Sequence, residues 1–339
     1  MRLATKVTQA VFFEKTLARD LRPTKFDWSI QARCIQQNTL RRTLRKPSTS
    51  FPVATQALDA AMPELPEVET MRRGLFPTIG GRICRIEFPK SRYRPIAMTP
   101  GPEQWSQKMV DTTICSIDRI AKRVLVRLSN TDSIVFQPKM AGLTLVSDPP
   151  TQEHIRLIVF LENAQADRII YWDRRGLGTM HLWTPAQQQE FLGPNVLGPD
   201  ALTIDPNEFY LRYSQLNRPV KPALLDQKLL AGVGNLYASE ILHRARIDPR
   251  SPCKRISKVK WSSIHQWMQQ VLQQAIQNEG STLSDGTYRN AINGEGGYQH
   301  FHLVYAREGQ NCRSCNQGTI RRIVQAQRST FYCPSCQKR

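Results

Sequence analysis

The C-terminal stretch CRSCNQGTIRRIVQAQRSTFYCPSC (residues 312–336) contains two CxxC pairs that are separated by 17 residues. This C-x2-C-x17-C-x2-C spacing is typical of a site in which four thiolates bind one zinc ion. Because four protein ligands leave no open coordination position, we expect a structural zinc ion and not a catalytic one. A redox function is the alternative, but a single CxxC pair would serve that chemistry. The predicted ligands are Cys312, Cys315, Cys333 and Cys336.

The segment between the two pairs, GTIRRIVQAQRSTFY (318–332), alternates in polarity and is rich in β-branched residues, which favours a β-hairpin. Its arginines suit contact with a phosphate backbone. We therefore predict a small zinc ribbon over residues 300–339 that presents Arg321, Arg322 and Arg328 to DNA.

The preceding region, residues 203–299, consists of segments with helical periodicity. One of them, LLAGVGNLYASE (229–240), has a glycine-containing turn directly before a helix. Backbone N–H groups at a helix start bind phosphate, and Asn235 could either cap the helix or donate its amide to a phosphate oxygen. A plain helix–helix turn is an equally good interpretation. Neither a GxGxxG fingerprint nor a Walker lysine follows, so no nucleotide cofactor is expected.

Residues 62–192 combine one short helix with many short alternating runs. Residues 66–75 fit a helix with one apolar face. Runs such as RVLVRL (123–128), with turn residues between them, predict a β-sandwich. The Gly- and Pro-rich residues 193–202 are interpreted as a linker. The predicted fold class is therefore α+β multidomain: an N-terminal β-sandwich, a helical module and a C-terminal zinc ribbon.

The charge balance predicts a polyanionic partner. The chain has 47 Lys+Arg against 28 Asp+Glu, a net charge of +19, and a pI near 9.9. Such an excess favours nucleic acid first and an anionic membrane surface second. No apolar run approaches the roughly 18 residues that span a membrane. No secretory signal opens the chain, so a disulfide framework is not expected either.

Residues 1–61 lack clear periodicity and are interpreted as a leader. They carry 11 Lys+Arg against 4 Asp+Glu, so +7 of the net charge belongs to them and +12 to residues 62–339. The composition favours disorder, and an Arg-rich, acid-poor segment is also typical of an organellar transit peptide. A third interpretation is that the start codon lies at Met62 and these residues are never made.

Three motifs in one order carry a family resemblance: MPELPEVET (62–70), KPALLDQKLLAGVGNLYASE (221–240), and the cysteine pairs with QRSTFYCPSC (327–336). Together they resemble bacterial formamidopyrimidine-DNA glycosylases over residues 62–339. The related endonuclease VIII branch typically has glycine where this chain has Leu65, so PELPE favours the purine branch.

The resemblance implies a function. It implies a β-sandwich, a helix–two-turn–helix module over residues 203–299, and a zinc finger. The implied enzyme is a bifunctional DNA glycosylase and AP lyase that removes 8-oxoguanine and formamidopyrimidines and cleaves the strand by β,δ-elimination. Damaged double-stranded DNA is the implied partner, and a monomer in the bacterial cytoplasm is expected, with organellar import only if the leader is a transit peptide.

The resemblance also implies four catalytic residues. The nucleophile is the free amine of Pro63, exposed once Met62 and everything before it is removed. Glu64 is the general acid beside it. Lys122 contacts phosphate and serves in β-elimination, although without the motif a surface lysine would be the plainer interpretation. Arg328 binds phosphate and serves in δ-elimination.

The remaining implied residues contact DNA. Met140, Arg175 and Leu177 would fill the gap left by an extruded base, with Arg175 facing the opposite cytosine. In DRRGLG (173–178) a shifted alignment would make Arg174 the inserted residue instead. The other expected phosphate contacts are Lys221, Asn235 and His154. Gln152 stands where the family often has a histidine that contacts phosphate, and His154 lies two residues on.

Two rival functions use the same features. One is a zinc-ribbon protein that binds DNA without catalysis, but a pure binder has no need for Pro63 and Glu64 together with Lys122 and Arg328. The other is an RNA-binding protein, which would bind RNA more tightly than an abasic duplex.

Overall fold

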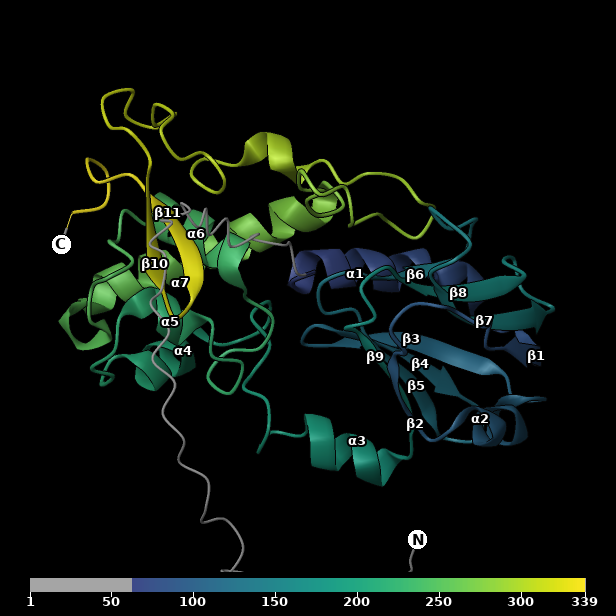
Figure 1. Cartoon of the computed structure of the whole chain (residues 1–339). Coiled ribbons are helices and arrows are strands. Elements are labelled where there is room, and N and C mark those ends of the chain that lie inside the picture. Colours follow the sequence, from purple (N-terminus) through teal and green to yellow (C-terminus); the bar gives the residue numbers. More distant parts are fainter. Residues whose placement is uncertain (1–62, 339) are drawn as a thin grey trace, which may run out of the picture. The chain divides into compact units, whose positions relative to one another are not determined.

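A computed structural model describes residues 63–338, so the predictions for the leader concern residues outside the described part. Within it, a β-sandwich is followed by a set of helices and a C-terminal β-hairpin (Figure 1). The fold class predicted from the sequence is confirmed. None of the helices in residues 63–338 combines the length and the apolar character needed to cross a membrane.

Two sheets form the sandwich. The four-stranded sheet has the order β1-β7-β8-β6, and all its neighbours are antiparallel. The five-stranded sheet has the order β2-β9-β5-β4-β3, in which only the β2–β9 pair is parallel. The strands are β1 (Arg82–Glu87), β2 (Ala97–Thr99), β3 (Ile114–Ile120), β4 (Arg123–Leu128), β5 (Ser133–Gln137), β6 (Gly142–Leu145), β7 (Ile155–Glu162), β8 (Arg168–Asp173) and β9 (Thr179–Trp183).

The first helix, α1 (Leu65–Gly74), connects the two hydrophobic cores. Val68 and Met71 are fully buried in the sandwich core, and Leu75 after the helix joins them. Leu65, at the start of the helix, lies instead in the core of the helical region. Pro66 occupies the first turn, where its missing N–H costs nothing. The predicted helix and its apolar face are therefore present. Short helices at the sandwich edges are η1 (Phe76–Thr78), α2 (Pro102–Met109) and α3 (Pro185–Leu192).

The helical region follows the predicted linker. Its longest helix, α7, packs against both α6 and α1. Trp261, Ile264 and Met268 of α7 are fully buried in its core. The helices are α4 (Pro206–Tyr213), α5 (Val220–Leu224), α6 (Asn235–Arg244), η2 (Cys253–Arg255), α7 (Lys258–Gln277) and η3 (Tyr298–Phe301).

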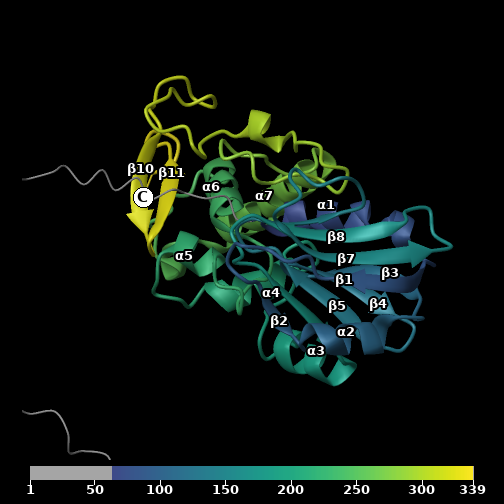
Figure 2. The same cartoon turned by 45° about the vertical axis from the view of Figure 1, so that its right-hand side comes forward.

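The predicted hairpin is formed by β10 (Arg321–Gln325) and β11 (Arg328–Tyr332), which pair antiparallel. Its two turn residues, Ala326 and Gln327, have positive φ angles of 47° and 60°, as the twist of a tight hairpin requires. Strand β11 packs against α6, and both views show the hairpin beside that helix (Figure 2). The ribbon is thus attached to the helix that follows the glycine turn.

Candidate active site and DNA-binding surface

Pro63 and Glu64 are buried directly before α1, against the glycine turn. The Leu65 N–H donates to the Gly232 carbonyl at 3.1 Å. The Glu64 carboxylate accepts hydrogen bonds from the backbone N–H groups of Leu236 (2.8 Å) and Tyr237 (3.4 Å), in the first turn of α6. The side chain that binds the N–H groups at the start of α6 therefore comes from a residue 172 positions earlier. Asn235, for which capping was one of two predicted roles, does not cap the helix.

Glycine is required at position 234 for this contact. A Cβ atom there would lie 2.2 Å from Cδ of Glu64, far inside the contact distance. Gly232, with φ of +111°, adopts a conformation that side chains disfavour. The glycine turn, which the sequence suggested as a phosphate site, thus packs against the Glu64 carboxylate.

A second carboxylate, that of Glu67, connects Glu64, Tyr237 and Ser281 through hydrogen bonds. Its Oε2 accepts the Glu64 N–H at 3.0 Å. Its Oε1 accepts the Tyr237 hydroxyl at 2.5 Å and the Ser281 N–H at 2.9 Å. Burial, together with the nearby charge of Glu64, raises the pKa of Glu67 to about 7. Burial also raises the pKa of Glu64, although the charge of Lys122 and the α6 N–H groups act in the opposite direction. At neutral pH Glu64 therefore retains more of its proton than an exposed glutamate would.

Lys122 lies in the two-residue turn between β3 and β4, next to Ala121, whose φ is 53°. Burial lowers the pKa of Lys122, the charge of Glu64 opposes this, and the charge of Arg328 adds to the lowering. A lowered pKa leaves more of the amine neutral and able to accept a proton. Arg328 is exposed at the start of β11. Glu64, Lys122 and Arg328 are thus close enough for the charges of the other two to act on Lys122, and Pro63 directly precedes Glu64, although the four residues span 265 positions of the sequence.

Lys221 is only 1% exposed and joins α5 to the ribbon. Its Nζ donates to Asn235 Oδ1 (2.8 Å), the Ser329 carbonyl (3.1 Å) and Thr330 Oγ1 (2.9 Å). Because Asn235 Oδ1 accepts from the ammonium group of Lys221, the NH2 group of Asn235 points away from Lys221. Asn235 is half-buried, so this amide can reach a ligand at the start of α6. The phosphate contacts predicted for both residues stay predictions.

The loop between β8 and β9 carries the predicted wedge residues. Asp173, which is fully buried, accepts the N–H groups of Arg175 and Gly176 at 2.9 Å each and that of Gly178 at 2.7 Å. Both arginines of the loop are exposed, but Arg174 donates from Nη2 to Thr287 Oγ1 at 2.6 Å. The side chain of Arg174 is therefore hydrogen-bonded within the protein.

The other predicted DNA contacts differ in exposure. Leu177 and Met140, the latter in the loop between β5 and β6, are half-buried. His154 is 8% exposed and packs between the rings of Tyr93 and Trp172, with centroid distances of 4.5 and 5.5 Å. Burial lowers the pKa of His154, and the phosphate contact predicted for it stays a prediction.

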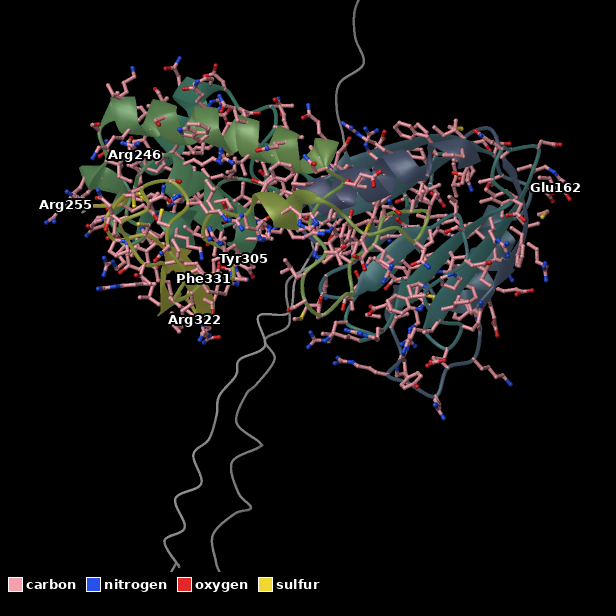
Figure 3. The ribbon with its side chains drawn as sticks, turned by 90° about the horizontal axis from the view of Figure 1, so that it is seen from above. Glu162, Arg246, Arg255, Tyr305, Arg322 and Phe331 are labelled. Carbon is pink, nitrogen blue, oxygen red and sulfur yellow. The ribbon has the colours of Figure 1, made fainter. Side chains whose placement is uncertain are left out.

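A cleft of about 800 Å³ opens beside this site. Its lining includes residues 282–285, Arg174, Arg175 and the buried rings of Tyr305 and Phe331, whose centroids are 5.2 Å apart. Figure 3 shows these two rings near each other. Ser281, whose N–H binds Glu67, directly precedes residues 282–285. The cleft therefore begins next to the α1 start, and it combines flat rings with cationic side chains.

Comparisons with known proteins agree on one family. Residues 62–180 match "Formamidopyrimidine-DNA glycosylase N-terminal domain", residues 195–287 match "Formamidopyrimidine-DNA glycosylase H2TH domain", and residues 309–339 match "Zinc finger found in FPG and IleRS". The chain is 37% identical over 284 residues to the formamidopyrimidine-DNA glycosylase of Chloroflexus aurantiacus, covering 81% of this chain and 98% of that one. It is 38% identical over 295 residues to that of Phenylobacterium zucineum, covering 82% and 100%.

This chain belongs to the formamidopyrimidine-DNA glycosylase family. The structure of the MutM (FPG) protein from Thermus thermophilus is similar, with a TM-score of 0.70, 33% identity, and coverage of 81% of this chain and 98% of that one. So is a complex between the Lactococcus lactis Fpg and an abasic site containing DNA, with a TM-score of 0.72, 29% identity, and coverage of 81% and 100%. The prediction of a DNA-repair glycosylase is confirmed.

The cysteines of this glycosylase fit one structural zinc ion, as predicted. All four Sγ atoms lie within 4.8 Å of one another. The Cys312–Cys336 and Cys315–Cys333 sulfur distances are 3.7 and 3.8 Å. A tetrahedron with Zn–S bonds of about 2.3 Å has edges of about 3.8 Å, so the thiolates are spaced for the metal.

Sequence reasoning missed several residues that organise this glycosylase's site. Tyr237 and Ser281 bind Glu67, and Asp173 shapes the wedge loop. The sequence offers one weak signal, because an aspartate before a glycine-rich loop is a common acceptor for loop N–H groups. Tyr237 and Ser281 carry no local signal, since their partner is 170 or more positions away.

Proposed function

We propose that this glycosylase excises oxidised purines, 8-oxoguanine and formamidopyrimidines, from double-stranded DNA and then cleaves the strand by β,δ-elimination. The proposal is carried by the buried Glu64 carboxylate, which lies beside Pro63 at the start of α6 and whose charge acts on Lys122. The charge of Arg328 acts on the same lysine. A protein that only binds DNA gains nothing from a buried carboxyl group and a lysine of lowered pKa at this point.

Each group has a step that suits its surroundings. The Pro63 amine attacks C1′ of the sugar as the C1′–base bond breaks, and the amine then loses its proton. Cleavage of the C1′–O4′ bond, with O4′ protonated, opens the ring and leaves an iminium ion between Pro63 and C1′. Glu64, whose pKa is raised by burial, donates a proton that assists base departure and opening of the sugar ring. Neutral Lys122 accepts the C2′ proton as the 3′-phosphate leaves. Arg328 binds phosphate and assists departure of the 5′-phosphate.

The cleft beside the site suits an extruded base. A base inside the duplex is shielded from the Pro63 amine, so it must leave the stack. Tyr305 and Phe331 close the cleft with buried apolar rings, and the polar groups of residues 282–285 can read the edge of the base. We therefore assign this cleft to the flipped purine.

The test is the release of base from defined duplexes by the chain that begins at Pro63. We expect 8-oxoguanine opposite cytosine to be released and the strand cut with phosphate at both new ends, while an undamaged duplex stays intact. Tighter binding to RNA than to an abasic duplex, with no base release, would favour the RNA-binding alternative.

Arg175 is expected to read the base opposite the lesion. Withdrawing a purine leaves the cytosine unpaired, and Met140 and Leu177 can fill volume but cannot donate a hydrogen bond. Arg174 is engaged with Thr287, which supports Arg175 as the inserted residue. Arg175→Ala should reduce the preference for cytosine over adenine opposite 8-oxoguanine by about tenfold, the worth of one good base contact.

The measurement is the ratio of excision rates with the two opposite bases, and abasic single strands serve as the control because no base needs extrusion there. Arg174→Ala is the matched variant. An altered ratio in Arg174→Ala alone would assign the insertion to Arg174, and equal losses on single strands and duplexes would move Arg175 to the chemistry or the fold.

A further inference from the structure

Arg119, near the end of β3, is a buried cation outside the predicted catalytic set. Its side chain is 9% exposed. Nε donates to Glu69 Oε2 at 3.2 Å, and Nη1 donates to the Ala121 carbonyl at 2.9 Å. The two terminal nitrogens also form a fork on Asp200, at 2.7 and 3.1 Å. One guanidinium group thus binds α1, the segment at Asp200, and the turn that directly follows the strand of Arg119.

Each of these segments leads to one part of the active site. Glu69 lies on α1, five residues after Glu64. Ala121 precedes Lys122 in the β3–β4 turn. Asp200 belongs to a segment that pairs with Ala231, since the Ala201 N–H donates to the Ala231 carbonyl at 3.0 Å and the Ala231 N–H to the Pro199 carbonyl at 2.9 Å.

The last connection reaches the glycine turn. Gly232 follows Ala231, and its carbonyl accepts the Leu65 N–H. The loop that begins α6, the helix that begins at Leu65, and the turn that carries Lys122 therefore share one ionic junction.

We propose that Arg119 is a positioning residue for the lyase step, holding the turn of Lys122 in place against Glu64 and the start of α6. This inference rests on the proposed function, because it assigns Arg119 an effect on the chemistry of Lys122. Arg119 itself does not touch the reacting atoms in this scheme.

The geometry requires arginine. A guanidinium group offers a planar fork that matches the Asp200 carboxylate while its remaining N–H groups bind Glu69 and Ala121. A lysine ammonium group is a single point donor and cannot reproduce the two-nitrogen fork on Asp200 while it also reaches Glu69 and Ala121. Glu69 keeps Arg72 and Arg73 as partners when Arg119 is changed, so the main losses fall on Asp200 and on the Ala121 turn.

The charges that face Lys122 and the burial of its side chain determine how its pKa changes when the turn moves. Burial is the largest cause of the lowered pKa of Lys122, and the charges of Arg328 on β11 and Arg123 on β4 lower it further. Glu64, directly before α1, and Glu67 on α1 raise it. If the turn moves toward water, burial is relieved and the pKa of Lys122 rises. The neutral amine then predominates only at higher pH, so the rise of the β-elimination rate with pH shifts to higher pH.

The experiment measures single-turnover β-elimination on a preformed abasic duplex from pH 5 to 10, in the chain that begins at Pro63 and contains every described element. Arg119→Lys should slow the neutral-pH rate about 10- to 100-fold, as small misplacements of catalytic groups do. The pH profile of the β-elimination rate should also shift to higher pH in Arg119→Lys, while the affinity for the abasic duplex should change by less than about threefold. Asp200→Asn, which removes one arm of the junction, should give a smaller change in the same direction.

Arg82→Lys is the matched control. Arg82 also joins two carboxylates, Asp111 and Glu162, but on β1 of the sandwich and largely exposed. The Arg82→Lys variant should leave the β-elimination rate and its pH profile unchanged. If Arg119→Lys and Asp200→Asn only lower Tm and keep the pH profile of the unchanged enzyme, Arg119 is a stabilising ion pair and the inference is wrong.

Lys122→Met separates this inference from the proposed function. If it abolishes β-elimination while Arg119→Lys has no effect on the pH profile, only the positioning role fails. If Lys122→Met leaves β-elimination intact, the assigned role of Lys122 is wrong and the inference about Arg119 is wrong with it.

Discussion

Borohydride is expected to trap a covalent complex between residues 63–339 and a duplex carrying 8-oxoguanine opposite cytosine, and deletion of Pro63 is expected to abolish it. Attack of the Pro63 amine on C1′ gives an iminium ion, and hydride addition to its C=N bond yields a stable tertiary amine. The α-amine is a suitable nucleophile because its pKa near 7.7–8.0 leaves about a tenth or more of it unprotonated at pH 7, against less than about a thousandth of a lysine.

The full chain of 339 residues is the sharpest control for this prediction. With residues 1–62 attached, the Pro63 nitrogen is an amide and has no nucleophilic lone pair, so no complex should form. Protein electrophoresis after reduction measures the trapped fraction, and N-terminal sequencing of the native protein shows where the chain begins. A complex that persists without Pro63, or that is absent when the free amine meets an abasic duplex, would assign the nucleophile elsewhere.

The elements set by local chemistry could be predicted from the sequence. The cysteine spacing predicted the zinc site, and the alternating segment between the pairs became the β10–β11 hairpin. Helix α1 begins within a residue or two of its expected start because Pro66 and the following apolar positions act on the nearest turns. The proposed catalytic residues could be inferred only through the order of three motifs, since no single residue type marks an N-terminal proline as a nucleophile.

Contacts between distant segments could not be predicted. Glu64 binds α6 and Glu67 binds Ser281 through hydrogen bonds that span 172 and 214 positions, and neither leaves a periodic trace. Exposure is equally hidden from the sequence. Lys221 and His154 look like surface residues in polar segments, yet both are buried by elements that approach from elsewhere in the chain. The same limit explains why Arg119, an arginine on a predicted strand, carried no signal before Asp200 was seen beside it.

The zinc site gives the second large prediction. Two paired strands of five residues are at best marginally stable alone, so the metal must supply much of the ribbon's free energy of folding. Structural zinc sites contribute about 10–16 kcal/mol of apparent binding free energy at neutral pH. Cys333 is fully buried, and its N–H donates to Gln337 at 2.8 Å, so no water can replace its thiolate without disturbing the chain.

Cys333→Ala is therefore expected to lose the single equivalent of zinc and to unfold the ribbon. Arg328 would leave the active site, and the buried Nζ of Lys221 would lose its Ser329 and Thr330 acceptors next to Asn235. Affinity for an abasic duplex should fall by about 100-fold or more, which is about 2.7 kcal/mol. The sandwich should stay folded, because its core contains no ribbon residue.

Metal analysis, duplex binding and near-UV circular dichroism measure these three effects, and Cys115→Ala is the matched control. Cys115 is exposed on β3 and lies outside the metal site, so its loss should change neither zinc content nor binding. A metal-free Cys333→Ala protein that binds abasic DNA normally would show that the ribbon folds without zinc. Arg328 would then be held by the remaining contacts of the hairpin, which are the packing of β11 on α6 and the hydrogen bonds from Lys221 to Ser329 and Thr330.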